Sequence, residues 1–320
     1  MTVTETQRPA GVGETLAAHS NHGGAGPARQ PHPQGPASPA RARQVLLEVV
    51  VPVYNEEADL SDNIRRLRGY LDAKLPFESL LTIADNGSTD KTWAIARSLS
   101  QQLAGTRAVH IDCPGRGRAL RSVWERSDAE VVAYMDIDLS TDLRALRPLL
   151  RPILTGQADL AIGSRLAKGS QTQRSIRRDV ISRAYNALLR TVLKSDYSDA
   201  QCGFKAMNAE VARAVLPQVL DNDWFFDTEL LAVAQARGLR TVEVPVRWVE
   251  DPGSRVKLVR TALQDLRGVC RLLFSPTLRE QRSLAAQRQA WGRAAKEPAV
   301  PSRRQRSLLE VSGIGRSAAL

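Results

Sequence analysis

Short apolar segments alternate with longer amphipathic segments over most of the chain after residue 45. Runs rich in Val, Ile and Leu predict strands, and apolar positions that recur every three or four residues predict helices. This alternation is typical of βαβ units, in which helices cover a mainly parallel sheet. The pattern therefore predicts an α/β, Rossmann-like fold, with strands at 45–53, 79–85, 107–112, 130–136 and 158–164 and helices at 58–71, 91–103, 117–127 and 143–154.

The alternation loosens after residue 170, where we expect helices at 174–194, 224–238 and 256–274 and a strand at 240–250. The first 42 residues are rich in Pro, Gly, Ala and His, so burial cannot offset the entropy of ordering them. The far end is basic, with 14 Lys and Arg against 4 Asp and Glu from residue 252 to 320. The chain is thus expected to have four parts, namely a disordered tail at 1–42, a folded domain at 43–256, amphipathic basic helices at 257–295 and a flexible tail at 296–320.

The overall charge narrows the choice of partners. The chain has 45 Lys and Arg and 34 Asp and Glu, a net charge of +11 that favours nucleic acid, anionic lipid or phosphorylated substrates. Aromatic residues make up 5% and no stacking or zinc motif occurs, so we expect no nucleic-acid partner. We expect neither a secretory signal nor a membrane span, because no apolar run approaches about 18 residues. Three distant cysteines predict no disulfide framework and are in keeping with the cytosol.

Acidic residues follow three of the predicted strands. Asp85 ends the second strand, Asp136 and Asp138 end the fourth, and the first runs into Pro-Val-Tyr-Asn-Glu-Glu at 52–57. Ligands of parallel sheets bind beyond the carboxyl ends of the strands, so these residues are expected to converge on one edge. An extended chain would point Asp136 and Asp138 the same way, as ligands of Mg²⁺ or Mn²⁺. The alternative is that both carboxylates cap the following helix.

Basic residues recur in glycine-containing loops and near strand ends. They are Arg116 and Arg118 in Gly-Arg-Gly-Arg, Arg165 in Gly-Ser-Arg, and Arg255 with Lys257 after Pro-Gly-Ser. Because guanidinium groups pair with phosphates in a bidentate manner, this set predicts a diphosphate-binding site. For each residue taken alone, a solvated surface charge is the alternative interpretation.

With these residues in place, the chain resembles family-2 glycosyltransferases of the GT-A fold, and within them the dolichyl- and polyprenyl-phosphate sugar synthases. The resemblance runs in family order over about two thirds of the chain, from Val49 to Lys257, through VVVPVYNEE, ADNGSTD, GRGRALR, MDIDLS, IGSR, DAQCGFKAM, FFDTELL and VPVRWVEDPGSRVK. The segments at 201–205, 226–229 and 248–254 look most like the dolichyl-phosphate glucosyltransferase branch.

The resemblance implies roles for individual residues. Asp85 would bind the base, Asp136 the ribose or the metal, and Asp138 the metal. The implied set comprises catalytic Asp138 and Asp227, metal ligands Asp136 and Asp138, nucleotide-sugar-binding Pro52, Tyr54, Glu56, Asp85, Gly117, Asp136 and Arg165, and acceptor-side Gln201, Lys205 and Arg255.

The implied reaction is an inverting transfer of a hexose, glucose favoured, from a nucleoside diphosphate sugar such as UDP-glucose to a polyprenyl phosphate. A phosphate acceptor would need no general base, whereas an alcohol would, and Asp227 is then the candidate. Helix-dipole stabilisation is the alternative role for Asp227 and Glu229. A cytoplasmic protein on the inner face of the membrane is expected, with the basic helix at 256–274 as the contact. The alternatives are a soluble alcohol or polysaccharide acceptor, and a non-catalytic nucleotide-sugar or membrane-surface binding protein.

Overall fold

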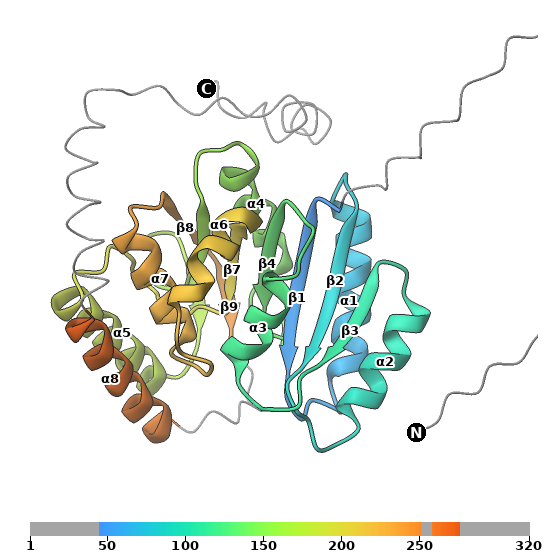
Figure 1. The fold of residues 1–320 in the computed structure, drawn as a ribbon, viewed down its shortest axis with the longest axis horizontal. Coiled ribbons are helices and arrows are strands. Elements are labelled where there is room, and N and C mark those ends of the chain that lie inside the picture. The colour runs from blue at the N-terminus through green and yellow to red at the C-terminus, as the bar shows by residue number, and fades with distance from the viewer. Residues whose placement is uncertain (1–44, 251–257, 276–320) are drawn as a thin grey trace, which may run out of the picture. The chain divides into compact units, whose positions relative to one another are not determined.

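A computed structural model describes residues 45–250 and 258–275, apart from the side chains of 177–178 and 258–263. Its centre is a seven-stranded sheet of order β3-β2-β1-β4-β7-β5-β8 (Figure 1). The strands are β1 Leu47–Val53, β2 Ser79–Asp85, β3 Thr106–His110, β4 Val131–Met135, β5 Leu160–Ser164, β7 Phe204–Asn208 and β8 Thr241–Pro245. All run in one direction except β7, which lies antiparallel between β4 and β5. The predicted α/β fold with a mainly parallel sheet is confirmed.

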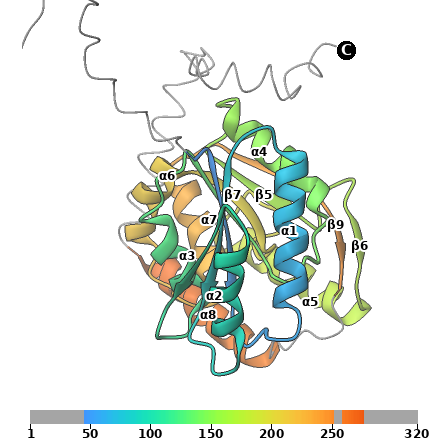
Figure 2. The same ribbon diagram turned by 90° about the vertical axis from the view of Figure 1, so that its right-hand side faces the viewer.

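Helices cover both faces of the sheet and divide the core into two apolar clusters. On one face pack α1 Leu60–Lys74, α2 Thr92–Gln102 and α4 Leu146–Leu154. On the other pack α3 Arg116–Trp124, α5 Ile176–Val192, α6 Ala209–Val215, α7 Phe226–Ala236 and α8 Leu258–Phe274. Figure 2 shows α1 and α3 on opposite sides of the sheet. The strands between the two clusters are buried on both faces, which explains their nearly continuous apolar sequences.

The strand predicted at 240–250 is wrong as a single element. It breaks into β8 and β9 Arg247–Val249, and β9 pairs with β6 Gln171–Gln173 in a separate two-stranded sheet. Pro245 pairs with Ser164 at the end of β8, and the N–H of Val246 donates to the Ser164 carbonyl. Because proline has no N–H, the ladder ends at this point and the chain turns into the second sheet. The helix predicted at 143–154 begins as a short 3₁₀ turn, Leu143–Ala145, before α4.

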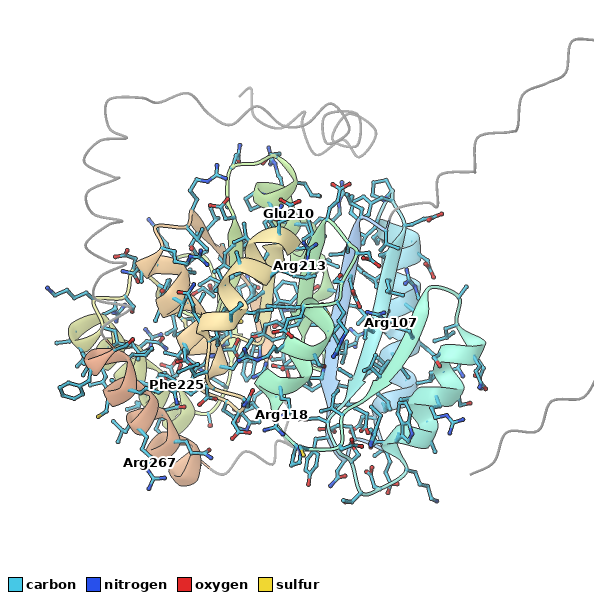
Figure 3. The ribbon with its side chains drawn as sticks, viewed as in Figure 1. Arg107, Arg118, Glu210, Arg213, Phe225 and Arg267 are labelled. Carbon is cyan, nitrogen blue, oxygen red and sulfur yellow. The ribbon has the colours of Figure 1, made fainter. Side chains whose placement is uncertain are left out.

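The parts predicted at 1–42 and 296–320 lie outside the described residues, as does most of the part at 257–295. Within that part the structure describes α8, which packs on the body. A Cβ on Gly268 of α8 would lie 2.3 Å from the ring of Phe225, the residue just before α7. The two segments therefore approach too closely for a larger residue at 268 unless that ring moves. Arg271 also donates to Glu229 over 2.8 Å. In Figure 3 Phe225 lies beside α8, whereas the side chain of Arg267 extends away from the body.

None of the described helices combines the length and the apolar character that a membrane crossing requires.

Candidate functional site

Six parallel strands bring their carboxyl ends to the same edge of the sheet, and β7 begins there. The loops after β1 and β2 are tied together at this edge. The Asn55 side chain accepts a hydrogen bond from the Thr89 N–H over 2.8 Å, and the Glu57 carboxylate accepts one from the Lys91 N–H over 3.0 Å. These bonds hold Tyr54 beside the edge with 47% of its surface exposed. Pro52 and Glu56, two other predicted ligands of the nucleotide sugar, are half-buried in the same segment.

Asp85 ends β2 as a fully buried carboxylate. One oxygen accepts from His110 Nδ1 over 2.6 Å, and the other has no hydrogen-bond partner among the described residues. A buried oxygen without a donor is costly, so it is suited to a ligand N–H or O–H. Trp93 packs against the His110 ring with centroids 5.1 Å apart and fixes its position. The turn after Asp85 requires Gly87, which has a φ of +70°.

Asp136 and Asp138 follow β4 in a turn rather than in the extended chain expected from the sequence. Their neighbours Ile137 and Leu139 are buried, so both carboxylates still face away from the core. The capping alternative does not hold for Asp136, because Asp142 caps the next helical turn by accepting from the Arg144 N–H over 3.0 Å.

Gly203 makes room for the Asp136 carboxylate. Met135 pairs with Phe204 across β4 and β7, so Asp136 lies opposite Gly203, whose carbonyl accepts the Asp136 N–H. A Cβ on Gly203 would come within 1.8 Å of Asp136 Oδ2. No other residue fits unless the carboxylate moves, which gives the glycine of the Gln-Cys-Gly-Phe-Lys segment a defined function.

A chain of charges runs from this carboxylate into the core. Arg116, the first residue of α3, lies 2.6 Å from Asp136 and 3.3 Å from Asp227. Asp227 also pairs with Lys205 over 2.8 Å and accepts a hydrogen bond from the Tyr134 hydroxyl. The predicted residues Asp136, Asp227 and Lys205, from three distant parts of the sequence, therefore form one cluster.

The groups of this cluster shift the pKa values of Asp136 and Asp227 in opposite directions. Asp136 keeps 44% of its side chain exposed, but the protein around it removes part of its hydration. This partial desolvation, and after it the neighbouring carboxylate of Asp138, raise the pKa of Asp136 above its ordinary value, although Arg116 opposes the shift. Burial would also raise the pKa of Asp227, but the charges of Lys205 and Arg116 outweigh it and hold that pKa below its ordinary value. Asp227 is therefore ionised at neutral pH.

Three further predicted residues make contacts within the protein. Arg165 binds Asp199 in a bidentate manner, over 2.7 and 2.8 Å, so its guanidinium is already anchored. A Cβ on Gly117 would lie 2.5 Å from the Phe226 side chain, so this glycine allows α3 to pack on α7. Gln201 donates to Asp265 of α8 over 2.8 Å. Arg255 and Lys257 lie outside the described residues.

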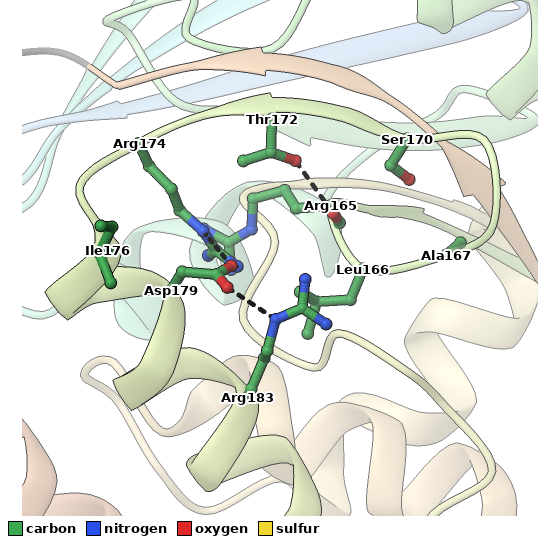
Figure 4. A pocket seen from close by; sticks show the side chains of 9 residues that line it. All are labelled: Arg165, Leu166, Ala167, Ser170, Thr172, Arg174, Ile176, Asp179 and Arg183. Carbon is green, nitrogen blue, oxygen red and sulfur yellow. Dashed lines mark hydrogen bonds and ion pairs between the residues drawn. The ribbon is translucent and has the colours of Figure 1, made fainter.

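Sequence reasoning missed a pocket of about 390 Å³ between the β5–β6 connection and the start of α5 (Figure 4). Its lining comprises Arg165, Leu166, Ala167, Ser170, Thr172, Arg174, Ile176, Asp179 and Arg183. Arg174 and Arg183 both donate to Asp179, over 2.8 and 2.7 Å. The three guanidinium groups are paired with two carboxylates, Asp179 and Asp199, which leaves the pocket positive. The charge of Arg165 also interacts with that of Asp136. Two features of the sequence relate to this pocket, namely the predicted phosphate-binding residue Arg165 and the basic residues of the helix predicted at 174–194.

The residues present fit a small divalent cation. In the described part of the chain no group of three or more His, Cys, Asp or Glu side chains could hold a metal alone. Asp136 and Asp138 offer two carboxylates, the hard oxygen ligands that Mg²⁺ and Mn²⁺ favour. Such ions commonly bind through one or two carboxylates and the phosphates of a substrate, so the pair suits a cation that arrives with a diphosphate.

We predict that Lys205→Met lowers the free energy of unfolding by about 3 kcal/mol, because it leaves Asp227 buried without its nearest cation. Asp227→Asn on top of this change should recover part of the loss, and Lys91→Met, at an exposed lysine, should alter it by less than about 0.5 kcal/mol. Urea unfolding at pH 7 measures all three. Because the pKa of Asp227 is lower in the folded protein, its contribution to the free energy of unfolding is complete above the pKa of an ordinary aspartate. This contribution is lost as the pH falls through the lowered pKa of the folded protein. Equal unfolding free energies for Lys205→Met and the wild type would contradict this prediction.

Comparison with known proteins agrees with this geometry. Residues 48–216 match the family model described as glycosyl transferase family 2. The chain is 39% identical over 236 residues to glycosyltransferase AglD of Haloferax volcanii, an alignment that covers 73% of this chain but only 38% of that protein. It is 31% identical over 224 residues to the dolichyl-phosphate beta-glucosyltransferase of Mus musculus, covering 66% of this chain and 69% of the relative.

Solved structures show the same fold. Glucosyl-3-phosphoglycerate synthase from Mycobacterium tuberculosis, solved with Mn²⁺ and UDP-glucose, superposes with a TM-score of 0.53 at 21% identity, covering 71% of this chain and 79% of that one. The fold is therefore of the GT-A type, as the sequence predicted. Together with the family match over more than half of its length, this shows that the chain is a glycosyltransferase and belongs to family 2.

Proposed function

We propose that the chain transfers a glucosyl group from UDP-glucose to a polyprenyl phosphate, with inversion and with Mg²⁺ or Mn²⁺ as cofactor, and that residues 43–256 form the transfer domain. The observation that carries this proposal is the pair Asp136 and Asp138 at the end of β4, together with a positive pocket lined by Arg165, whose charge also interacts with that of Asp136. The names of several relatives support the acceptor, since they are dolichyl-phosphate beta-glucosyltransferases.

On the donor side, each group has a defined task in the proposal. The unpartnered oxygen of Asp85 accepts the N–H of the base, and Tyr54 covers the base or ribose from the loop after β1. Asp136 and Asp138 hold the cation. When bound, the cation stabilises the negative charge that develops on the leaving diphosphate. The positive end of α3 and the side chain of Arg116 lie close enough to Asp136 to assist in this.

On the acceptor side, the positive pocket suits a phosphate. The second pKa of a phosphate monoester is about 6, so at neutral pH the acceptor is already ionised and needs no general base. The nearly complete burial of Asp227 and its pairing with Lys205 support a positioning role for this carboxylate. A soluble phosphorylated acceptor is the second candidate, because the same guanidinium groups would bind it.

A lipid acceptor requires contact with a membrane, which we propose to be peripheral and on the cytoplasmic face. Two helices on one side of the molecule expose large apolar side chains. Ile176 of α5 is 84% exposed and Phe274 of α8 is 73% exposed, with Val180 and Leu266 also exposed on these helices. Tyr185 of α5 interacts with Asp265 of α8, so the two helices adjoin. Apolar side chains next to arginines are the surface that anionic lipid binds.

The transfer reaction is tested with purified protein, Mn²⁺ or Mg²⁺, a panel of nucleoside diphosphate sugars, and either polyprenyl phosphate in detergent or phosphoglyceric acid. We expect release of UDP from UDP-glucose that depends on the lipid. Asp138→Asn should lower the rate at least about a hundredfold by weakening the stabilisation of the leaving group. Asp128→Asn, at an exposed position just before β4 and therefore at the opposite edge of the sheet from Asp138, is the matched control. Turnover with phosphoglyceric acid alone would favour the soluble acceptor, and no turnover of any donor by folded protein would refute the proposal.

Membrane contact is tested by sedimentation with vesicles of phosphatidylcholine, with and without phosphatidylglycerol. Binding should rise with the anionic lipid and fall several-fold in the double variant Ile176→Ser/Phe274→Ser, because both substitutions remove apolar surface from the contact. The control Leu220→Ser removes a side chain that is 62% exposed on the connection between α6 and α7. Equal binding by the double variant and this control would exclude the surface formed by α5 and α8.

A further inference from the structure

Arg116 lies between the carboxylates of Asp136 and Asp227, and only one of them has a second cation close by. Asp227 has a second cation, Lys205, 2.8 Å away, and the Tyr134 hydroxyl as well. Asp136 has no such alternative, because within the described residues Arg116 alone donates a side-chain hydrogen bond to it, over 2.6 Å. If Arg116 moves away, Asp227 is still neutralised by Lys205. Asp136, in contrast, loses its hydrogen-bonded cation.

The Arg116 side chain is buried and held in place, yet one of its hydrogen-bond donors has no acceptor among the described residues. It lies between two rings, with its guanidinium carbon 5.2 Å from the Tyr134 centroid and 5.0 Å from the Trp224 centroid. It is about nine-tenths buried, yet its Nε–H has no hydrogen-bond acceptor among the described residues. A buried donor without an acceptor is costly, which points to a further anionic partner. Because Arg116 begins α3, that partner would also meet the positive end of the helix.

The charges around Arg116 disfavour a cation that arrives alone. Asp136, Asp138 and Asp227 face Arg116 and Lys205, three carboxylates against two cations, so the cluster has one net negative charge. A divalent ion by itself would make the cluster positive and would lie close to the guanidinium, where partial burial strengthens the repulsion. A diphosphate that arrives with the ion restores a negative balance and offers Arg116 new oxygens.

We propose that Arg116 is an exchangeable counter-ion for the metal ligand Asp136. In the free protein its guanidinium neutralises Asp136. When a nucleoside diphosphate binds, the guanidinium turns to the phosphate oxygens, to which it can pair in a bidentate manner, and Asp136 becomes available to the divalent cation. The metal and the nucleotide therefore bind cooperatively, and each alone binds weakly. This inference rests on the proposed function, because it assigns the order of events at the same site.

The test measures Mn²⁺ binding by the full chain through the EPR signal of the free ion, without and with UDP, so that no turnover is involved. In the wild type, UDP should tighten Mn²⁺ binding at least about fivefold, the lower end of typical coupling. Arg116→Gln should bind Mn²⁺ alone several-fold more tightly than the wild type, and UDP should then tighten Mn²⁺ binding by a smaller factor than it does in the wild type. Arg126→Gln, which removes an exposed charge just beyond the other end of α3, should behave as the wild type.

Circular dichroism establishes that each variant is folded. Arg116→Lys provides the second variant, since it keeps the charge but cannot reach both carboxylates. It should bind Mn²⁺ alone with an affinity between those of the wild type and Arg116→Gln. Coupling between UDP and Mn²⁺ of the same size in Arg116→Gln as in the wild type would overturn the exchange and leave the proposed function intact. A wild-type protein that binds no Mn²⁺ even with UDP would overturn both.

Discussion

The ammonium of Lys205 and the carboxylate of Asp227 lie 2.8 Å apart, almost fully buried between β7 and α7. Removing two charges from water is costly, and the pair is stable only because further groups complete it. The Cys202 carbonyl and the Tyr134 hydroxyl are within hydrogen-bond distance of the ammonium, at 2.7 and 3.1 Å. The pair fixes where Asp227 lies, Asp227 helps to hold Arg116, and Arg116 fixes Asp136. The electrostatic environment of Asp136, which we propose as a metal ligand, is thus set by groups in the core of the protein.

The antiparallel strand makes this arrangement possible. A parallel strand at the place of β7 would bring its carboxyl end to the ligand-binding edge, whereas β7 brings its start. Gly203, just before β7, therefore lies against Asp136, and Lys205 points into the core two residues later. The same connection carries Gln201, which binds Asp265 of α8. One short segment links the edge of the sheet, the buried charge pair and the helix that we propose to contact lipid.

The sequence predicted the elements that depend on a local pattern of apolar and polar residues. The strands that end at Asp85 and near Asp136 were evident, because long apolar runs mark strands buried on both faces. Strand β7 was not predicted, since five residues that include a lysine do not resemble a buried strand, and only the distant Asp227 makes its burial possible. The pocket beside α5 was missed for the same reason, because it depends on ion pairs around Asp179 that form only when the loop and helix meet. Strand-end and glycine-loop patterns indicated Asp136 and Arg116, and the family resemblance added Asp227 and Lys205. The place of Tyr134 in the cluster and all of the contacts came from the structure.

A crystal structure with Mn²⁺ and UDP, recorded with anomalous scattering from manganese, is the most direct test of the central claim that this edge of the sheet binds a metal–nucleotide pair. The account predicts a manganese peak coordinated by Asp136 and Asp138 and a uracil ring hydrogen-bonded to Asp85. A manganese ion bound elsewhere, or a uracil ring away from Asp85, would contradict it.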